Sequence, residues 1–285
     1  MQESAGKNLF HNKRRVGILG YGNLGRFLAK KISESSNFEI AFIWNRTKAA
    51  LKESVDSYLI LESIDDFQSR TPDIVVEVAH PSVTKNYGNR ILQYCDYMIG
   101  SPTALSDEYL LEELKTAAKV NGLYVPSGAL WGGEDIRKMS DFGILQSLTI
   151  TMKKHPKSLK LEGYLKDKNS EVKDEAVVLY RGSVQDICAF APHNTNTMAA
   201  AAIAAPNLGF KGVECCLVSD PNLMDYHIVE IEGYGVPQAD GSRFHVHTVR
   251  RNPAKIGEVT GFATAGAFFG SLKNAVAKGP GIHLC

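Results

Sequence analysis

The chain has 285 residues, of which 44% are hydrophobic and 22% are charged. This composition is typical of a folded globular protein, and the length suits two domains. A formal net charge of +1 gives no reason to expect a nucleic acid or an anionic membrane as partner, and no apolar run is long enough to cross a bilayer. The polar, basic segment 1–15 lacks the apolar stretch of a secretory signal.

The cysteine pattern favours a reduced, cytoplasmic protein. The number of cysteines is odd, and none of them forms a Cys-x-x-Cys pair, so neither a disulfide framework nor a structural zinc site is expected. His245 and His247 share one face of a predicted strand, but no carboxylate or cysteine nearby completes a ligand set. We therefore expect no metal site. The cysteines are Cys95, Cys188, Cys215, Cys216 and Cys285.

Apolar, β-branched runs alternate with amphipathic helical patterns through the first half of the chain. Strands that alternate with helices imply a parallel, doubly wound α/β sheet. The predicted strands are 15–19, 39–44, 73–79, 97–100 and 123–126, and the predicted helices are 24–35, 83–94 and one that begins after a Ser106 cap.

The first predicted strand ends in Gly-x-Gly-x-x-Gly, and a helical pattern follows at once. In such a turn the backbone approaches a dinucleotide pyrophosphate, and the helix N-terminus offers its free N–H groups to the anion. A glycine-rich turn without a ligand is the plain alternative, but the strand before the motif and the helix after it favour a Rossmann-type fold. The expected cofactor contacts are Gly20, Gly22, Asn23, Leu24 and Gly25.

Asn45 and Arg46 follow the second predicted strand, where an acidic residue commonly binds the adenosine ribose. Without an acid there, nothing repels a 2′-phosphate, and Arg46 is able to pair with one. A capping Asn beside a solvated Arg explains the pair equally well. Because Asn45 can also bind an NAD ribose, both NAD and NADP remain open.

Ala79 and His80 end the strand 73–79. The carboxyl ends of such strands face the ligand crevice, so both residues are candidate cofactor contacts. The simpler interpretation is a histidine at a strand end that makes a structural hydrogen bond.

The pattern changes after residue 126, where strands follow one another with few helices between them. Strands are predicted at 148–153, 177–180, 213–219, 227–232 and 243–249, an Ala-rich helix at 198–205, and a solvated polar excursion at 155–175. A closing helix at 259–277 can return to the first domain. We therefore expect a dinucleotide-binding domain of 1–126 plus 253–285, and an α+β domain of 127–252 for substrate binding and dimerisation.

Two loops and one histidine of the second half are candidate ligand contacts. The glycine-rich loop 127–133 suits a close approach to a ligand or a hinge, and the segment 190–197 suits an amide or carboxylate ligand unless its asparagines only cap the next helix. Histidine is the side chain whose usual pKa suits proton transfer near neutrality, which makes His227 a candidate. Spacing alone leaves His227 an ordinary histidine at the edge of a loop.

Several segments together resemble the L-aspartate dehydrogenases, and in particular the animal members of that family. They are GYGNLG, VVEVAHP, GSPTALSD, PSGALWGGEDI, FAPHNTNTMAAAA and SDPNLMDYHIVEIEG, in this order over nearly the whole chain. The resemblance implies a Rossmann domain joined to a substrate domain, a homodimer, and NAD or NADP as cofactor. It also implies that Ala129 and Asn196 contact the cofactor and that His227 is the catalytic histidine.

The expected reaction is the reversible, NAD(P)-dependent oxidative deamination of L-aspartate to iminosuccinate, which hydrolyses to oxaloacetate and ammonia. Candidates for binding the two substrate carboxylates are His80, the helix start near Thr197, and Lys153 or Arg137. Microbial members tend to carry an acidic residue near position 45, so the cofactor preference stays open. The alternatives are an oxidoreductase of the homoserine dehydrogenase or dihydrodipicolinate reductase type, and a non-catalytic NAD(P)-binding redox sensor.

Overall fold

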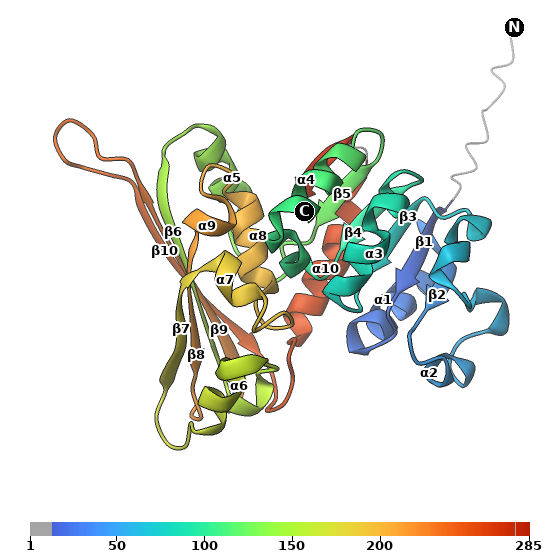
Figure 1. Cartoon of the computed structure of the whole chain (residues 1–285), viewed down its shortest axis with the longest axis horizontal. Helices are drawn as coiled ribbons and strands as arrows, with labels where there is room; N and C mark the ends of the chain where they lie inside the picture. The colour runs from blue at the N-terminus through green and yellow to red at the C-terminus, as the bar shows by residue number, and fades with distance from the viewer. Residues whose placement is uncertain (1–12, 277) are drawn as a thin grey trace, which may run out of the picture.

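The computed structural model describes residues 13–276 and 278–285, and these residues form two β-sheets with helices between them (Figure 1). The first sheet is parallel and has six strands, and the second is mixed and has five. This confirms the predicted class, a Rossmann-type sheet followed by an α+β unit. In the described part of the chain no helix combines the length and the apolarity needed to cross a membrane.

The first sheet has the strand order β11-β5-β4-β3-β1-β2, so the chain changes direction across the sheet after β2. A single parallel bridge joins Ile43 of the edge strand β2 to Ile60, which lies at the position where the Rossmann order has a further strand. Because of this change of direction, the loops that follow β1 and β3 leave neighbouring carboxyl ends of the sheet, and such sheets bind their ligands at this point. The strands are β1 (Arg14–Leu19), β2 (Phe38–Trp44), β3 (Ile74–Glu77), β4 (Asp96–Ile99), β5 (Gly122–Val125) and β11 (Gly281–Leu284).

The helices of this half follow the predicted amphipathic patterns, and α1 buries Leu28 and Ile32 against the sheet. One expected cap is wrong: Asp107, not Ser106, caps α4, since its carboxylate accepts from the Leu110 N–H while the Ser106 hydroxyl donates to the Thr103 carbonyl. The helices are α1 (Asn23–Ser33), α2 (Ala49–Lys52), α3 (Pro81–Leu92) and α4 (Glu108–Ala117), with 3-10 helices η1 (Ser57–Leu59), η2 (Ile64–Arg70) and η3 (Pro102–Ser106).

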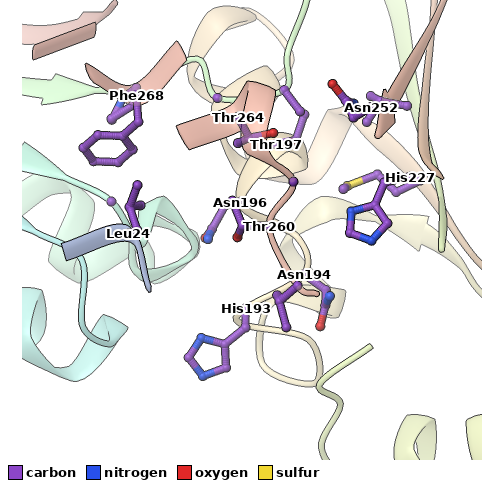
Figure 2. A pocket seen from close by; sticks show the side chains of 18 of the residues that line it. Leu24, His193, Asn194, Asn196, Thr197, His227, Asn252, Thr260, Thr264 and Phe268 are labelled. Atoms are coloured by element: carbon purple, nitrogen blue, oxygen red, sulfur yellow. The ribbon is translucent and has the colours of Figure 1, made fainter. Parts of the chain in front are cut away.

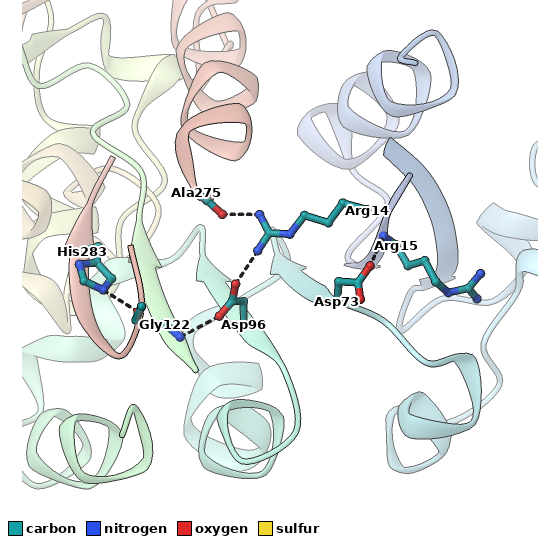
Figure 3. Close-up of polar contacts among 8 residues, drawn as sticks. Arg14, Arg15, Asp73, Asp96, Gly122, Ala275 and His283 are labelled. Carbon is teal, nitrogen blue, oxygen red and sulfur yellow. Dashed lines mark hydrogen bonds and ion pairs between the residues drawn. The ribbon is translucent and has the colours of Figure 1, made fainter. Parts of the chain in front are cut away.

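The C-terminal segment returns to the first sheet. Helix α10 (Phe262–Asn274) is shorter than the predicted 259–277, of which residue 277 lies outside the described residues, and its Phe268 and Leu272 join the core of the first sheet. Arg14 of β1 connects the end of α10 to the sheet, because its guanidinium donates to the Ala275 carbonyl after α10 and to the Asp96 carboxylate of β4 (Figure 3). Strand β11, which pairs with β5, was not predicted.

The second sheet has the order β10-β9-β6-β8-β7, and one of its faces packs on helices while the other has none over it (Figure 1). Side chains alternate between the two faces, so the apolar residues of one parity, such as Ile150 and Ile231, enter the core. The strands are β6 (Leu145–Lys154), β7 (Val177–Ser183), β8 (Glu214–Ser219), β9 (Tyr226–Gly235) and β10 (His245–Pro253).

Helix α8 lies between the sheets and is buried on all sides. Its small alanine side chains let the surrounding elements approach closely, which fixes the position of its N-terminus. The expected solvated excursion at 155–175 is wrong in part, because it contains α6, whose Leu165 is fully buried. The helices are α5 (Gly133–Asp141), which was not predicted, α6 (Gly163–Ser170), α7 (Val184–Cys188), α8 (Asn196–Ala204) and α9 (Gly209–Gly212), with the 3-10 helix η4 (Pro156–Ser158).

Candidate functional site

A pocket lies between the two sheets, at the carboxyl ends of the parallel strands. Figure 2 shows Leu24 and Phe268 on the side of the first sheet, His227 and Asn252 on the opposite side, and Asn196 between them. Of the residues predicted as cofactor contacts or as catalytic, the pocket brings together Leu24, Ala129, Asn196 and His227, which are far apart in the sequence, and Thr197, a candidate for a substrate carboxylate, lines it as well.

The glycine turn joins β1 to α1 at the edge of this pocket. Gly25 lies so close to the turn that an added Cβ would be 2.1 Å from the Gly20 carbonyl oxygen, whereas a Cβ on Gly22 would meet nothing within 4 Å. Gly22 is also the N-cap of α1 and offers no side chain to the helix N–H groups. The turn therefore leaves open space and free N–H donors at one point, which is what a pyrophosphate needs.

Asn45 and Arg46 lie beside this turn, outside the pocket. The Asn45 side chain accepts from the Tyr21 N–H at 3.1 Å and donates to the Thr47 carbonyl at 3.0 Å, so it holds the glycine turn against the end of β2. Arg46 is exposed and has no hydrogen bond or ion pair with any residue that the structure describes. Its guanidinium is thus available to an anion at the adenosine end of a dinucleotide.

A buried carboxylate supports the loops after β3 and β4. Glu77 accepts from the Ala79 N–H at 2.7 Å, from the Ser101 N–H at 2.9 Å and from the Ser101 hydroxyl at 3.1 Å. Burial raises the pKa of Glu77 to about 7, although these donors favour the ionised form. The predicted contact Ala79 is therefore fixed through its backbone.

His80 makes the structural hydrogen bond that was the simpler interpretation. It is the N-cap of α3, and its Nδ1 accepts from the Ser82 N–H at 3.2 Å. The His80 ring packs against the ring of His193 in an edge-to-face arrangement, with 5.5 Å between the ring centroids, and His193 lines the pocket. His80 thus lies beside the pocket wall, while one of its ring nitrogens is occupied by the helix cap.

The two asparagines of segment 190–197 have different surroundings. The Asn194 side chain accepts from the Lys160 N–H at 2.7 Å and donates to the Ser158 carbonyl, so it holds η4 in place. Asn196 begins α8, and its Oδ1 is buried without a hydrogen-bond partner in the described chain. Neither asparagine caps α8, because the N-cap is Thr195. Of the two asparagines, therefore, Asn196 is the one whose buried polar atom has no partner among the described residues.

His227 lies in the second position of β9, opposite Asn252 of β10, and is 5% exposed. Its Nε2 is buried and lacks a hydrogen-bond partner among the described residues. Burial, followed by the charge of Lys154, lowers the pKa of His227 to about 4. The imidazole is therefore neutral at physiological pH and can accept a proton.

Lys154, the last residue of β6, was missed by sequence reasoning. It is 4% exposed, lines the pocket, and donates to the Val259 carbonyl at 2.9 Å. Burial lowers the pKa of this lysine to about 8. The alternation of Leu148, Ile150 and Met152 places Lys154 on the same inner face, so strand parity was a signal that could have found it.

The two basic residues first considered for the substrate carboxylates lie elsewhere. Lys153 faces the other side of the sheet and pairs with Glu230 at 2.7 Å, and Arg137 pairs with Asp141 on α5 at 2.8 Å. Both cations are thus already neutralised by neighbouring carboxylates. Among the described residues that line the pocket there is no aspartate or glutamate.

Comparison with protein families matches both halves of the chain. Residues 135–274 match the family model "Aspartate dehydrogenase, C-terminal", and residues 20–126 match the model "Homoserine dehydrogenase, NAD binding domain". The second match agrees with the fold of the first sheet and with the glycine turn that ends β1.

Curated relatives extend the match to nearly the whole chain. A zebrafish (Danio rerio) aspartate dehydrogenase domain-containing protein is 49% identical over 95% of this chain and 98% of its own length. The L-aspartate dehydrogenase of Nitrosopumilus maritimus is 30% identical over 77% of this chain and 84% of its own length.

Solved structures agree with the fold. The crystal structure of aspartate dehydrogenase from Thermotoga maritima superposes with a TM-score of 0.64 at 26% identity, and covers 94% of this chain and 98% of that one. The diaminopimelate (DAP) dehydrogenase of Corynebacterium glutamicum, at 16% identity and a TM-score of 0.52, covers 95% of this chain and 92% of that one, and shares the fold alone.

Proposed function

Because the chain belongs to the aspartate dehydrogenase family, we propose that it catalyses the reversible, NAD(P)-dependent oxidative deamination of L-aspartate. The product iminosuccinate takes up water and releases ammonia to give oxaloacetate. The observation that carries the proposal is the pocket between the sheets, which is lined by Asn196 and His227, each with a buried unpartnered polar atom, and by Leu24 of the glycine turn. Buried polar atoms without partners are costly, so their presence favours a ligand that satisfies them.

The residues present suit a nicotinamide dinucleotide. Gly22 and the uncapped N-terminus of α1 fit the pyrophosphate, and Ala129 and Asn196 lie in the pocket where the reacting end would be held. A nicotinamide held there would supply the hydride acceptor for oxidation at Cα of the substrate. Ala129 adds only a small side chain to the pocket wall, and the Asn196 amide can orient a polar group of the ligand.

His227 is proposed as the general base and acid. In the oxidative direction its neutral imidazole takes a proton from the substrate amine or from the water that attacks the imine carbon. In the reverse direction the imidazolium returns that proton. A pKa held below neutrality keeps the base unprotonated before the substrate arrives.

Both NAD and NADP are proposed as cofactors. Asn45 is neutral, so it can accept a hydrogen bond from a ribose hydroxyl and does not repel a 2′-phosphate. Arg46 has no partner among the described residues that would compete with a phosphate. Residues 1–126 with 253–285 would hold most of this cofactor, and residues 127–252 would hold the substrate and, through Ala129 and Asn196, the reacting end of the cofactor.

We further propose a cytoplasmic homodimer, as the resemblance implies. The five cysteines are free thiols, which suits a reducing compartment. The helix-free face of the second sheet carries exposed apolar side chains, including Val178 and Val249, which suits a second copy of the chain. Light scattering of the purified protein would give its mass, and a monomer would contradict the dimer.

The experiment that tests the proposed function measures NAD(P)H formation when L-aspartate is added to the purified protein. Homoserine and related amino and hydroxy acids serve as competing substrates, each with NAD and with NADP. We expect turnover with L-aspartate to exceed that with the other acids. Faster turnover with homoserine would favour the alternative oxidoreductase, and tight cofactor binding without turnover on any acid would favour a redox sensor.

A further inference from the structure

Lys154 is a buried cation without a buried anion. Its ammonium donates one hydrogen bond, to the Val259 carbonyl, and no described carboxylate lies within 4.0 Å of it. An ammonium has three donors, so two of them remain for another acceptor. Isolated buried charges are expensive, and proteins retain them mainly where a ligand or a metal supplies the opposite charge.

Two helix N-termini add partial positive charge to the pocket that Lys154 lines. The helix N-termini of α8 and α10 both contribute residues to the pocket, Asn196 and Thr197 from the first and Thr264 from the second. Neither helix has a side-chain cap on its first N–H groups. The free N–H groups and the helix dipoles add partial positive charge to that of the lysine.

The register of the second sheet places Lys154 beside the proposed base. Lys153 pairs with Ile228, so the next residue along β6 lies opposite His227, which in turn pairs with Asn252. The three side chains therefore form a row across β6, β9 and β10 on the pocket face. A ligand whose amine reaches His227 has its neighbouring acidic group within reach of this row.

We propose that Lys154 binds a carboxylate of the substrate and so makes the site selective for amino dicarboxylic acids. The inference rests on the proposed function for the identity of that substrate. The bound carboxylate would accept from the two unused ammonium donors and neutralise the buried charge. Aspartate, with carboxylates on both sides of the reacting carbon, offers two groups that can occupy this position.

The first test titrates succinate, a dicarboxylate without an amine, into the protein saturated with NADH or NADPH, and measures heat of binding. Removing one partner of a buried charge pair costs about 2 to 5 kcal/mol, so we expect Lys154→Met to weaken succinate at least about 30-fold. Lys154→Arg should retain part of the affinity. Lys153→Met is the matched control, since its side chain lies on the opposite face, and it should bind succinate as the unchanged protein does.

A second readout separates recognition from a structural role. If the lysine served only to hold the Val259 loop, Lys154→Met would lower the melting temperature and weaken the cofactor as well. We expect the melting temperature to stay the same or to rise, because the variant removes a charge that burial disfavours, and we expect the cofactor to bind unchanged. A lower melting temperature together with a weaker cofactor would overturn the proposal, as would succinate binding within threefold of the unchanged protein.

Two further ligands show which carboxylate is bound. L-asparagine has an amide in place of the side-chain carboxylate, and β-alanine lacks the α-carboxylate. The ligand whose affinity is the same with and without the Lys154→Met change is the one that lacks the carboxylate held by Lys154. If neither ligand distinguishes the two proteins, the proposal is wrong.

The binding test is independent of the reaction. If L-aspartate is oxidised but Lys154→Met leaves succinate binding unchanged, the proposed function stands and the role of Lys154 falls. If succinate binding depends on Lys154 but L-aspartate is not oxidised, carboxylate recognition stands and the proposed function falls.

Discussion

The two halves of the pocket differ in how their buried polar groups are satisfied. On the side of the first sheet, Glu77 accepts three hydrogen bonds from neighbouring loops, and the side chains of Asn45 and His80 are bonded within their own turns. On the side of the second sheet, His227 keeps a buried atom without a partner in the described chain and Lys154 lacks an anion, while Asn196 lies between the two sides with its Oδ1 also unpartnered.

This difference separates a preformed site from one that its ligand completes. The cofactor side is organised by backbone and short-range hydrogen bonds, so it needs little rearrangement to bind a dinucleotide. Each unpaired buried group on the other side costs roughly 1 to 3 kcal/mol until a ligand satisfies it. Substitutions on the first side should therefore act on folding and cofactor affinity, and those on the second side on substrate and turnover.

The largest effect is expected from His227→Ala. Loss of a general acid–base group lowers turnover by about 10²- to 10⁴-fold, and we expect kcat for L-aspartate to fall within this range while the cofactor still binds. The rate of NAD(P)H formation at saturating L-aspartate measures the loss. His247→Ala is the control, because His247 is exposed on β10 and does not line the pocket. Wild-type turnover in a folded His227→Ala protein would remove His227 from the mechanism.

On the cofactor side, Gly25→Ala and Gly22→Ala should separate folding from binding. A Cβ at Gly25 collides with the Gly20 carbonyl, so the strand–helix turn must open, and we expect a loss of several kcal/mol in the free energy of unfolding. A Cβ at Gly22 meets no protein atom, so only the poorer N-cap propensity of Ala should count, and stability should fall by no more than about 1 kcal/mol while cofactor affinity falls.

Thermal denaturation with and without NADH or NADPH measures both effects. Equal losses of stability in the two variants would contradict the assignment of Gly22 to the ligand and Gly25 to the packing of β1 on α1.

The same contrast explains what the sequence could predict. The cofactor side depends on local order, in which strand, glycines and helix are consecutive, so the motif 20–25 and the parallel sheet were predicted from pattern alone. The returning strand β11 was not, because four residues at the chain's end carry too weak a pattern, and their pairing with β5 spans about 160 residues.

The substrate side depends on register between distant strands. Spacing alone left His227 an ordinary histidine, and only the resemblance singled it out. Lys153 was considered in place of Lys154, although a shift of one residue along a strand reverses the face. Helix α6 was read as part of a solvated excursion because the segment 155–175 is polar and rich in Lys, Asp and Glu, and one buried leucine anchors the helix. Pairings of this kind become visible only once the sheet is formed.

The burial of His227 should make the free energy of unfolding depend on pH below neutrality. His227 has a pKa of about 4 in the folded protein and about 6.5 when unfolded. As the pH falls below about 6.5, His227 binds a proton in the unfolded chain, whereas in the folded protein it does so only near pH 4. The unchanged protein should therefore lose up to about 3 kcal/mol of stability over this range relative to His227→Gln, with no such difference above pH 7.

Urea denaturation of both proteins between pH 7.5 and 4 measures this difference. Burial raises the pKa of Glu77 to about 7, so this carboxyl titrates over an overlapping range, but it is present in both proteins and cancels. Parallel stability curves for the two proteins would show that His227 is not held neutral by its surroundings.

The smallest effect is expected at the exposed end of the cofactor side. Arg46 is solvated, and exposed charge pairs contribute about 0.2 to 1 kcal/mol, so Arg46→Ala should lower the ratio of kcat/KM with NADP to that with NAD by no more than about fivefold. Added salt should reduce the effect, because an exposed pair is screened. Lys48→Ala is the control, since Lys48 already pairs with Glu62 and should leave the ratio unchanged. A ratio that Arg46→Ala does not alter would mean that the cofactor side recognises the dinucleotide through its backbone and Asn45 alone.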